Sequence, residues 1–457
     1  MQYSIINFSE AKKEKRFDAE FYKNDYVKIL NNILKHNYKF LYEIASNKYK
    51  KLPNNKKDIE WKYIEIDKII CFQNDYNYTI FLKGDTLPSR ASKIPKLHDI
   101  IISTVRPTRS AICIFNDIEK DIIVSSGFSI VHTDKINNNY LYTVLSSSFY
   151  LKLYERLTKA SMYPAMSEED LFNLPIPIFS DEFQKSIEKL VLEAHNQRQI
   201  SNSLMKEANE ILEKEIGFDK LEIKKKKVNY SIVNYSETLL SKRIDAEYYQ
   251  EKYKIIMDKI QSYKNGYDIL DNICSIKKGI EPGSEYYRDN GIPFLRIQNL
   301  TKYDLKLDNC IYVDNDFYNK NIEYRADKDD ILLSKDGTPG IAYHIYNLNN
   351  LNNLNMITSG GILRLKIKDN ILLPEVLALV LNSKVVDYQV KQASGGAVIL
   401  HWRMEEIFNT VIPIIDKNVQ NLIANKVQEA YKARDRAKAL LEEAKKKVED
   451  AIENGEN

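Results

Sequence analysis

The chain has 457 residues, with 67 Lys and Arg against 64 Asp and Glu, so its formal net charge is only +3. A protein that coats nucleic acid non-specifically carries a larger basic excess, so any DNA binding must rest on local charge or on a partner. Hydrophobic residues make up 44% of the sequence, which is enough for two or three domains with real cores.

The cysteines and the N-terminus indicate a soluble cytoplasmic protein. No two cysteines are close enough for a Cys-x-x-Cys pair, and no His stands beside them at zinc-ligand spacing, so we expect no disulfide framework, metal or cofactor. Free thiols suit a reducing compartment. The first residues lack the basic region and apolar stretch of a signal peptide, and no apolar run approaches the length of a membrane span.

Residues 1–179 read as a first mixed domain. Residues 62–66 alternate as in a strand, residues 100–102 read as a buried strand, and one helix is expected at about 139–159. Pro175-Ile-Pro177 blocks a helix.

A long helix is predicted over residues 180–217. Ser180 or Asp181 can cap its start, an apolar stripe continues at three- and four-residue spacing, and Gly217 ends it. Residues 218–229 then read as a solvated linker, which includes the lysine run 224–227.

Residues 230–457 repeat this order. Residues 3–22 and 230–249 match at 12 of 20 positions without a gap, far above the one in about 20 expected by chance. Asp99-Ile-Ile-Ile-Ser103 lines up with Asp330-Ile-Leu-Leu-Ser334, and Ser126-Gly127 lines up with Ser359-Gly360. The second domain spans 230–415, with a helix at about 374–392, and a second long helix spans 416–453.

The predicted fold class is therefore α+β. Two homologous mixed domains are expected to be separated by two long antiparallel helices, which form a coiled-coil spacer with pseudo-two-fold symmetry. Each helix has about 36 residues and is roughly 54 Å long, more than a small domain can cover. The alternative is that each helix packs only on its own domain.

The turns that follow two matched strands carry residue types suited to DNA. Thr104-Val-Arg-Pro-Thr-Arg109 places two guanidinium groups on a rigid turn, and Arg suits bidentate contact with guanine, while Thr and Ser hydroxyls can hold phosphates. The equivalent turn, Lys335-Asp-Gly-Thr-Pro-Gly340, offers a cation, a carboxylate that can accept from cytosine and a flexible glycine. Both stretches could equally be plain turns with solvated charges. Loops at Ser161–Tyr163 and Ser394–Gly396 occupy matched positions before the last strand.

The chain resembles the specificity subunits of type I restriction–modification enzymes along nearly its whole length. Four phrases in order carry the resemblance: Leu87-Pro-Ser-Arg-Ala91, Asp99-Ile-Ile-Ile-Ser-Thr-Val-Arg-Pro107, Gly291-Ile-Pro-Phe-Leu-Arg-Ile-Gln-Asn299 and Asp330-Ile-Leu-Leu-Ser-Lys-Asp-Gly-Thr338. The first half has Trp61-Lys-Tyr-Ile-Glu-Ile66 in place of the Gly-Ile-Pro phrase. The resemblance implies two target-recognition domains that read a split DNA site.

It also implies a subunit without catalytic chemistry. Such a subunit docks DNA methyltransferase subunits, two in number, and in the full complex also restriction and translocase subunits. The candidate DNA-binding residues are Ser89, Arg90, Thr104, Arg106, Thr108, Arg109, Arg296, Gln298, Lys335, Asp336, Gly337, Thr338 and Ser394. The candidate partner-binding residues, on the charged face expected for the second long helix, are Glu429, Lys432, Arg434, Asp435 and Lys438.

The main rival interpretation is an enzyme. An amine methyltransferase needs an Asn/Asp-Pro-Pro-aromatic loop and a Gly-rich turn, but Pro-Pro occurs nowhere, and a P-loop is also absent. Glu60-Trp-Lys62 alone suggests a nuclease core, yet no acidic ligand stands at suitable spacing upstream. A duplicated scaffold that does not bind DNA, and a two-subunit restriction system whose partner both cuts and methylates, remain open.

Overall fold

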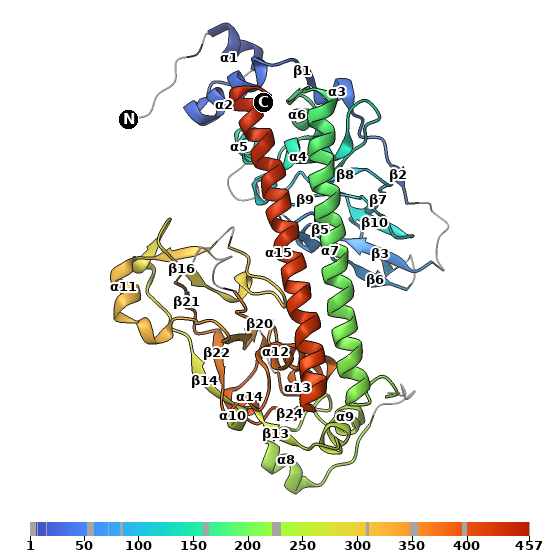
Figure 1. The fold of residues 1–457 in the computed structure, drawn as a ribbon, viewed down its shortest axis with the longest axis vertical. Helices are drawn as coiled ribbons and strands as arrows, with labels where there is room; N and C mark the ends of the chain where they lie inside the picture. The colour runs from blue at the N-terminus through green and yellow to red at the C-terminus, as the bar shows by residue number, and fades with distance from the viewer. Residues whose placement is uncertain are drawn as a thin grey trace. The chain divides into compact units, whose positions relative to one another are not determined.

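The computed structural model describes residues 6, 8–14, 16–52, 59–71, 73–82, 86–158, 164–221, 230–307, 310–347, 355–394 and 400–456. The chain forms two compact units: residues 1–200 with 433–457 are unit 1, and residues 201–432 are unit 2. Figure 1 labels the elements of both. Among the described helices, none has the combined length and apolarity that crossing a lipid bilayer requires.

Unit 1 combines short helices with twisted sheets. Its short helices are α1 (Phe8–Glu14), α2 (Asn24–Leu34), α3 (Leu41–Ile44), α4 (Asn138–Ser146), α5 (Ser148–Leu157) and α6 (Glu168–Phe172). Its strands are β1 (Tyr38–Phe40), β2 (Lys50–Lys51), β3 (Trp61–Ile64), β4 (Ile69–Ile70), β5 (Asp75–Tyr76), β6 (Thr79–Phe81), β7 (Ala91–Ile94), β8 (Ile100–Ser103), β9 (Ile112–Ile114), β10 (Ile122–Ser125), β11 (Phe128–Val131) and β12 (Pro175–Pro177). The sheets have the strand orders β2-β7-β10-β3-β6, β11-β8-β9, β1-β12 and β4-β5.

Unit 2 has the same kind of construction. Its short helices are α8 (Tyr235–Ser241), α9 (Glu251–Gln261), α10 (Leu270–Ile273), α11 (Asn315–Lys320), α12 (Pro374–Asn382), α13 (Lys384–Ala393) and α14 (Met404–Phe408). Its strands are β13 (Tyr267–Ile269), β14 (Cys274–Lys278), β15 (Tyr287–Arg288), β16 (Ile292–Leu295), β17 (Ile311–Val313), β18 (Ile331–Ser334), β19 (Asp336–Gly337), β20 (Ala342–His344), β21 (Ile357–Thr358), β22 (Ile362–Ile367), β23 (Leu400–His401) and β24 (Val411–Pro413). The sheets have the strand orders β14-β22-β18-β20, β15-β17-β16-β21, β13-β24 and β19-β23.

The repeated segment at the start of each half builds a small hydrogen-bonded turn. In unit 1, Arg16 forms an ion pair with Asp18 at 2.6 Å and lies over the Phe21 ring, with 4.6 Å from the guanidinium to the ring centroid. The Asp18 carboxylate also accepts from the backbone N–H of Phe21 at 3.1 Å. The matching residues of unit 2 are Arg243, Asp245 and Tyr248, with distances of 2.6, 5.0 and 3.1 Å for the same three contacts. The arginine and the aspartate that are identical in both copies of the repeat therefore form the same ion pair in each unit.

The single helix expected at 139–159, and the one at 374–392, are each two helices. Ser147 separates α4 from α5, and Ser383 separates α12 from α13. Both serines have extended backbone, and their hydroxyls accept from N–H groups of the next helix, which begins a new helix instead of continuing the old one. The expectation of a continuous helix was wrong because the apolar spacing passes through the capping serine unchanged.

The two long helices are α7 (Asp181–Glu215) and α15 (Lys417–Asn454), drawn in green and red in Figure 1. Each contributes to both units, so the units do not follow the linear boundaries expected from the sequence. In unit 2 the Ser201 hydroxyl donates to the Ala430 carbonyl at 2.8 Å, and Glu207 pairs with Lys426 at 2.5 Å. The partner numbers fall as the α7 numbers rise, so the helices are antiparallel.

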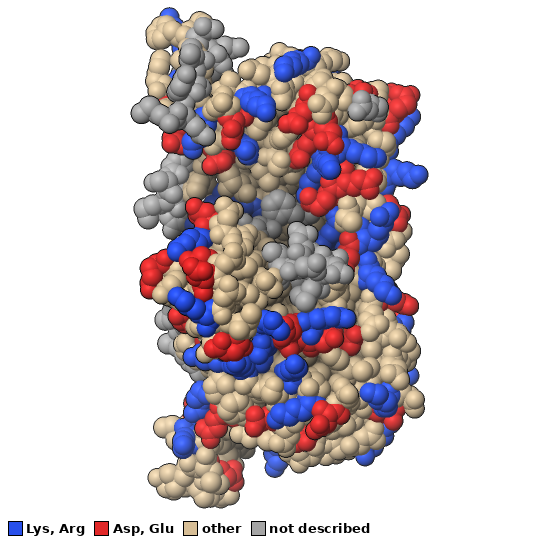
Figure 2. Space-filling view, turned by 60° about the vertical axis from the view of Figure 1, so that its left-hand side comes forward, with Lys and Arg blue, Asp and Glu red and all other residues tan. Residues whose placement is uncertain are grey.

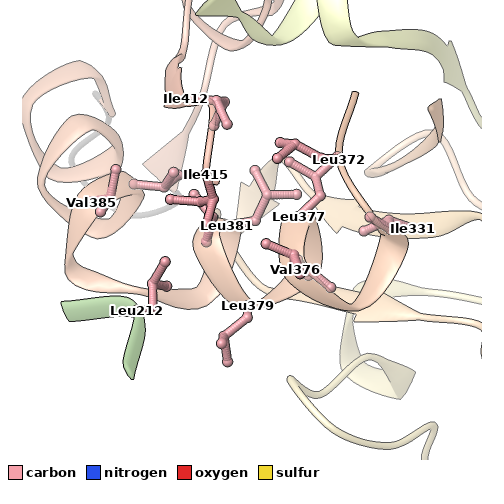
Figure 3. Packing of buried hydrophobic residues seen from close by; sticks show 14 of the residues in the cluster. Leu212, Ile331, Leu372, Val376, Leu377, Leu379, Leu381, Val385, Ile412 and Ile415 are labelled. Atoms are coloured by element: carbon pink, nitrogen blue, oxygen red, sulfur yellow. The ribbon is translucent and has the colours of Figure 1, made fainter. Parts of the chain in front are cut away.

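The stripes of the two helices are equivalent residue by residue. In unit 1, the first half of α7 packs into one core with the second half of α15; the buried residues are Ile187, Val191, Ala194, Leu440, Leu441, Ala444, Val448 and Ile452. In unit 2 the roles are exchanged, and the buried residues are Ile423, Val427, Ala430, Met205, Ala208, Leu212 and Ile216. Figure 3 shows Leu212 within this second core, beside residues of α12. Burial of such stripes is the main stabilisation of long helices in water.

One glutamine on each long helix connects that helix to its own domain, and the hydrogen bonds are the same in both units. Gln184 donates to the Phe179 carbonyl at 3.0 Å and accepts from the N–H of Asn137 at 3.1 Å. Gln420 donates to the Ile415 carbonyl and accepts from the N–H of Leu373, both at 2.9 Å. The fold is thus the expected α+β class, with two homologous domains and an antiparallel helix pair. Residues 222–229, with the predicted linker lysines 224–227, lie outside the described residues.

Candidate nucleic-acid interface

In unit 1, four chain segments meet where strands end. Strands β3 and β10 are parallel, so the turn Ile66–Lys68 after β3 and the turn at Gly127 after β10 lie at one edge. The N–H and hydroxyl of Thr104, which follows β8, both donate to the Gly127 carbonyl, at 2.9 and 3.0 Å. The N–H of Ser126 donates to the Arg90 carbonyl at 2.7 Å. The structure therefore brings Arg90 and Thr104 together with two turns that contain no predicted site residue.

Unit 2 builds the equivalent edge. Strands β16 and β21 are parallel, and β16 is followed by the turn Ile297–Asn299. The N–H of Lys335, which follows β18, donates to the Gly361 carbonyl at 3.0 Å, as Thr104 does to Gly127. The edge of unit 2 therefore contains Arg296, Gln298 and the turn 335–338, all of which the sequence had singled out.

A close approach between an isoleucine and a glycine fixes both edges. A Cβ added to Gly127 would lie 2.8 Å from Cδ1 of Ile66, and a Cβ added to Gly361 would lie 2.6 Å from Cδ1 of Ile297. A larger residue at either position would require the isoleucine side chain to move. The turn after the parallel strand is thus held at the same place in both units. Gly127 is matched by Gly361, so the alignment of Ser126–Gly127 with Ser359–Gly360 was wrong by one residue. We call the three turns of each unit, after β3, β10 and β8 or after β16, β21 and β18, its reading edge.

The turn after β8 holds Arg106 in a conformation that arginine rarely adopts. Its φ is +49°, in the left-handed region, and the matched residue of unit 2 is Gly337, with φ +67°. The left-handed region costs a side-chain-bearing residue about 1–2 kcal/mol, which glycine avoids. The N–H of Arg106 donates to the Pro164 carbonyl at 2.7 Å, which holds this backbone in place. Strain of this kind gathers at functional sites.

In unit 2 the Asp336 carboxylate is held from both sides. Its Oδ2 accepts from Lys335 Nζ at 2.5 Å, and its Oδ1 lies 2.8 Å from Nδ1 of His401. Burial acts to raise the pKa of Asp336, but the hydrogen bonds from Lys335 and His401 outweigh it, so that the pKa is lowered. The pairing of β19 with β23 positions His401 opposite Asp336. Sequence reasoning missed His401, because 65 residues separate it from Asp336 and no motif links them.

The other predicted DNA-binding residues differ in accessibility. Exposed ones are Ser89, Arg90, Thr108, Arg109, Gln298, Gly337 and Thr338, and half-buried ones are Thr104, Arg106, Arg296, Lys335, Asp336 and Ser394. The loops at 161–163 and 395–396 lie outside the described residues. The face drawn in Figure 2 shows basic and acidic residues interspersed, in keeping with the small net charge.

The five predicted partner-binding residues all lie on α15, and one of them is not on its exposed face. Glu429 and Lys432 are exposed, and Asp435 and Lys438 are half-buried. Arg434 is only 3% exposed, so it was wrongly assigned to the exposed face. Its matched residue on α7, Arg198, is likewise buried at 6% and reaches Gln73 at 2.7 Å and Asp75 at 3.7 Å. Burial raises the pKa of the half-buried Asp75, and Arg198 and Arg434 both act against that rise, so one carboxylate attracts the arginine of each helix.

Comparison with known proteins identifies a matching domain in the second half of the chain. Residues 268–446, which include the reading edge of unit 2, match the type I restriction modification DNA specificity domain. Unit 1 repeats the frame of the matched region, as the sequence offsets and the two reading edges demonstrate. This match confirms the resemblance to type I restriction–modification specificity subunits that the sequence shows. The function that the match indicates is DNA sequence specificity. No curated protein matches this chain in sequence.

Solved structures of type I restriction–modification proteins are similar to this chain over most of its length. An HsdS subunit from Thermoanaerobacter tengcongensis is 17% identical, with 92% of this chain and 97% of that chain covered and a TM-score of 0.31. An S subunit from M. genitalium is 12% identical, with 92% and 96% covered and a TM-score of 0.39.

Among the described residues of the chain, no group of three or more His, Cys, Asp or Glu side chains is placed to hold a metal ion.

Proposed function

We propose that the specificity subunit reads a bipartite DNA target, with one half-site contacted by the reading edge of each unit, and delivers methyltransferase subunits to it. The observation that carries the proposal is that the two reading edges have the same backbone frame and different side chains. A frame kept constant positions a reader, and side chains that differ give each reader its own base sequence. The subunit itself does no chemistry in this scheme and acts without a cofactor.

The side chains on each edge suit the task. In unit 1, Arg106 and Arg109 stand on a turn that is bounded by buried strands, with Arg90 beside it. In unit 2, Lys335, Asp336 and His401 form a preorganised polar cluster next to Arg296 and Gln298. Arginine suits guanine, glutamine suits adenine, and hydroxyls such as those of Thr108 and Thr338 suit phosphates.

Half-site-specific loss of recognition tests this proposal. The subunit is expressed with its methyltransferase, and methylated sites are mapped across the genome. The change of Arg106 and Arg109 to Ala should relax one half of the motif, and Lys335→Ala should relax the other, at about 1–3 kcal/mol for each lost base contact. Equal loss at both halves would refute independent reading. Thr108→Ala is the control, because a lost phosphate contact weakens all sequences alike.

Partner docking is proposed for two kinds of surface, of which one occurs in both units and so fits two methyltransferase subunits. The charged residues of α15, Glu429 and Lys432 among them, form the surface that occurs once. Large apolar side chains of the duplicated first segment are another: Phe8 and Tyr235 are 74% and 77% exposed at matched positions, and Phe17 and Ile244 are 70% and 89% exposed. Exposed apolar patches often mark protein interaction sites. One similar solved structure concerns the complex assembly and conformational transition of a type I system. Restriction subunits are proposed as further partners.

Co-purification distinguishes the two docking surfaces. Charge reversal at Glu429, Lys432, Asp435 and Lys438 together, or replacement of Phe8 and Tyr235 by Ser, should each reduce the methyltransferase recovered with the tagged subunit. Replacement of Leu82, an apolar residue that is 73% exposed outside the repeated segment, by Ser is the matched control. Full recovery with both variants would refute the assignment of these surfaces.

A further inference from the structure

The turn that follows the parallel strand carries opposite chemistry in the two units. Ile66 of unit 1 and Ile297 of unit 2 occupy the same place against a glycine. Glu65 is therefore matched with Arg296, and Asp67 is matched with Gln298. The sequence had pointed to Arg296 and Gln298 only, because the familiar Gly-Ile-Pro phrase is missing from the first half.

The backbones of the two turns are equivalent, so the matched side chains leave the frame at the same point. Glu65 has φ −88° and ψ 167°, and Arg296 has φ −110° and ψ 166°. Each is followed by one 3-10 turn, closed by a hydrogen bond from Lys68 N–H to the Glu65 carbonyl at 3.1 Å or from Asn299 N–H to the Arg296 carbonyl at 2.8 Å. The exchange of charge is thus a change of side chains on an unchanged support.

The two carboxylates have no structural task among the described residues of unit 1. Neither Glu65 nor Asp67 has a hydrogen-bond or ion-pair partner there for its side chain. By contrast, Glu119 pairs with Lys62, and Glu168 pairs with Lys93 at 2.9 Å. Asp67 is exposed and Glu65 is half-buried, so their charges are available to a ligand.

Both carboxylates belong to the reading edge electrostatically. Burial raises the pKa of the Tyr63 phenol; the hydrogen bond to Ser125 and the charge of Arg90 act against this rise, while Glu65 and Asp67 add to it. The two acids and Arg90 therefore act electrostatically on the same buried phenol. Carboxylates at an edge that faces a polyanion weaken binding to phosphates, and they are favourable there only where they accept hydrogen bonds from base amino groups.

We infer that Glu65 and Asp67 determine the specificity of unit 1 by accepting hydrogen bonds from the exocyclic amino group of cytosine in the first half-site. Arg296 and Gln298 do the corresponding work in unit 2, where they select guanine and adenine. This inference rests on the proposed function and deepens it. Ionised carboxylates only accept hydrogen bonds, and in the major groove cytosine offers a donor where guanine offers acceptors.

The test uses the full subunit with its methyltransferase. The double variant Glu65→Gln, Asp67→Asn keeps the shape and removes both charges. Glu60→Gln is the control, because Glu60 is an exposed acid at the opposite end of β3. Methylated sites are mapped and the base preference is scored in each half of the motif. The double variant should lose tenfold or more of its discrimination at a C·G pair of the first half-site, with the second half-site and the control unchanged.

A second variant tests whether the base preference of the first half-site can be redirected. Glu65→Arg with Asp67→Gln transplants the residues of unit 2 and should shift preference in the first half-site toward guanine or adenine. An unchanged first half-site in both variants would overturn the inference, while the proposed function would stand as long as the wild-type complex methylates a split motif. If the wild-type complex methylates no split motif, the proposed function itself falls. A double variant that melts several degrees below wild type would also contradict the inference, because the carboxylates would then be structural.

Discussion

The two units attach their variable parts to the long helices by different chemistry. In unit 1, Arg198 of α7 reaches Asp75 of β5, in a setting where burial raises the pKa of Asp75 and Arg198 and Arg434 oppose that rise. In unit 2, Tyr431 of α15 stacks on Tyr346 with ring centroids 4.0 Å apart. One attachment is a partly buried ion pair and the other is an aromatic stack.

The parts that do not vary show what the duplication conserves. The same glutamine ties, the same Arg–Asp turn and the same Ile–Gly contact recur in both units. These contacts fix backbone positions. The residues that vary lie on the reading edges and on the attachments to the helices. If the reading edges contact DNA as proposed, the chain can change the bases that it recognises without changing this frame.

The largest effect is expected for a chain that contains only the first half of the sequence and must pair with a second copy of itself. A chain of residues 1–229 keeps the whole of α7 but loses α15, whose Leu441, Ala444 and Val448 complete the core of unit 1. A second copy can supply Met205, Ala208 and Leu212, which fill the matched positions in unit 2. The expected product is a two-fold dimer with two identical reading edges.

The target of this half-chain should become an inverted repeat of the first half-site, as mapped by methylation with the partner methyltransferase. A monomeric fragment on sedimentation would show that the helix stripes are not interchangeable. Methylation of the original asymmetric motif would show that unit 2 takes no part in recognition, which would remove the basis of the comparison between the units.

The next largest effect separates the two attachments. Asp75→Ala leaves Arg198 buried without its charge partner and should lower the stability of unit 1 by about 3 kcal/mol. Tyr346→Leu keeps an apolar side chain and loses mainly the stacking, which is worth about 1 kcal/mol. Hydrogen exchange resolved by peptide should show the first change in unit 1 and the second in unit 2. Equal costs would mean that the ion pair contributes no more than the stack.

The sequence predicted the frame better than the sites. Repeats and helical stripes located both long helices and their pairing, because the apolar stripe positions are buried or half-buried. The break at Ser147 was missed, since a capping serine does not interrupt apolar spacing. The burial of Arg434 was missed because its environment depends on Asp75, which is remote in sequence. His401 and Glu65 were missed for the same reason: strand pairing, not proximity in the chain, brings them to the reading edges.

The smallest effect on stability concerns the left-handed residue that differs between the two edges. Arg106→Gly installs the residue that unit 2 has at this position, Gly337, and relieves about 1–2 kcal/mol of backbone strain, part of which the greater freedom of glycine in the unfolded chain cancels. The free energy of unfolding should be unchanged or raised by up to about 1 kcal/mol. Recognition of the first half-site should still weaken, by about 1–3 kcal/mol for a base contact.

A substitution at the matched position of unit 2 isolates the contribution of the left-handed backbone to stability. A Cβ added at Gly337 would meet no atom within 4 Å, so Gly337→Ala has no steric cost, and only the conformational cost of about 1 kcal/mol remains. Arg106→Ala completes the set, because it removes the side chain and keeps the strain. If Arg106 is held in a strained conformation for reading DNA, the Gly and Ala variants should weaken first-half-site recognition equally in methylation mapping and differ only in thermal stability. A stability loss with Arg106→Gly would mean that the arginine side chain serves the fold, and the left-handed backbone would then be no sign of function.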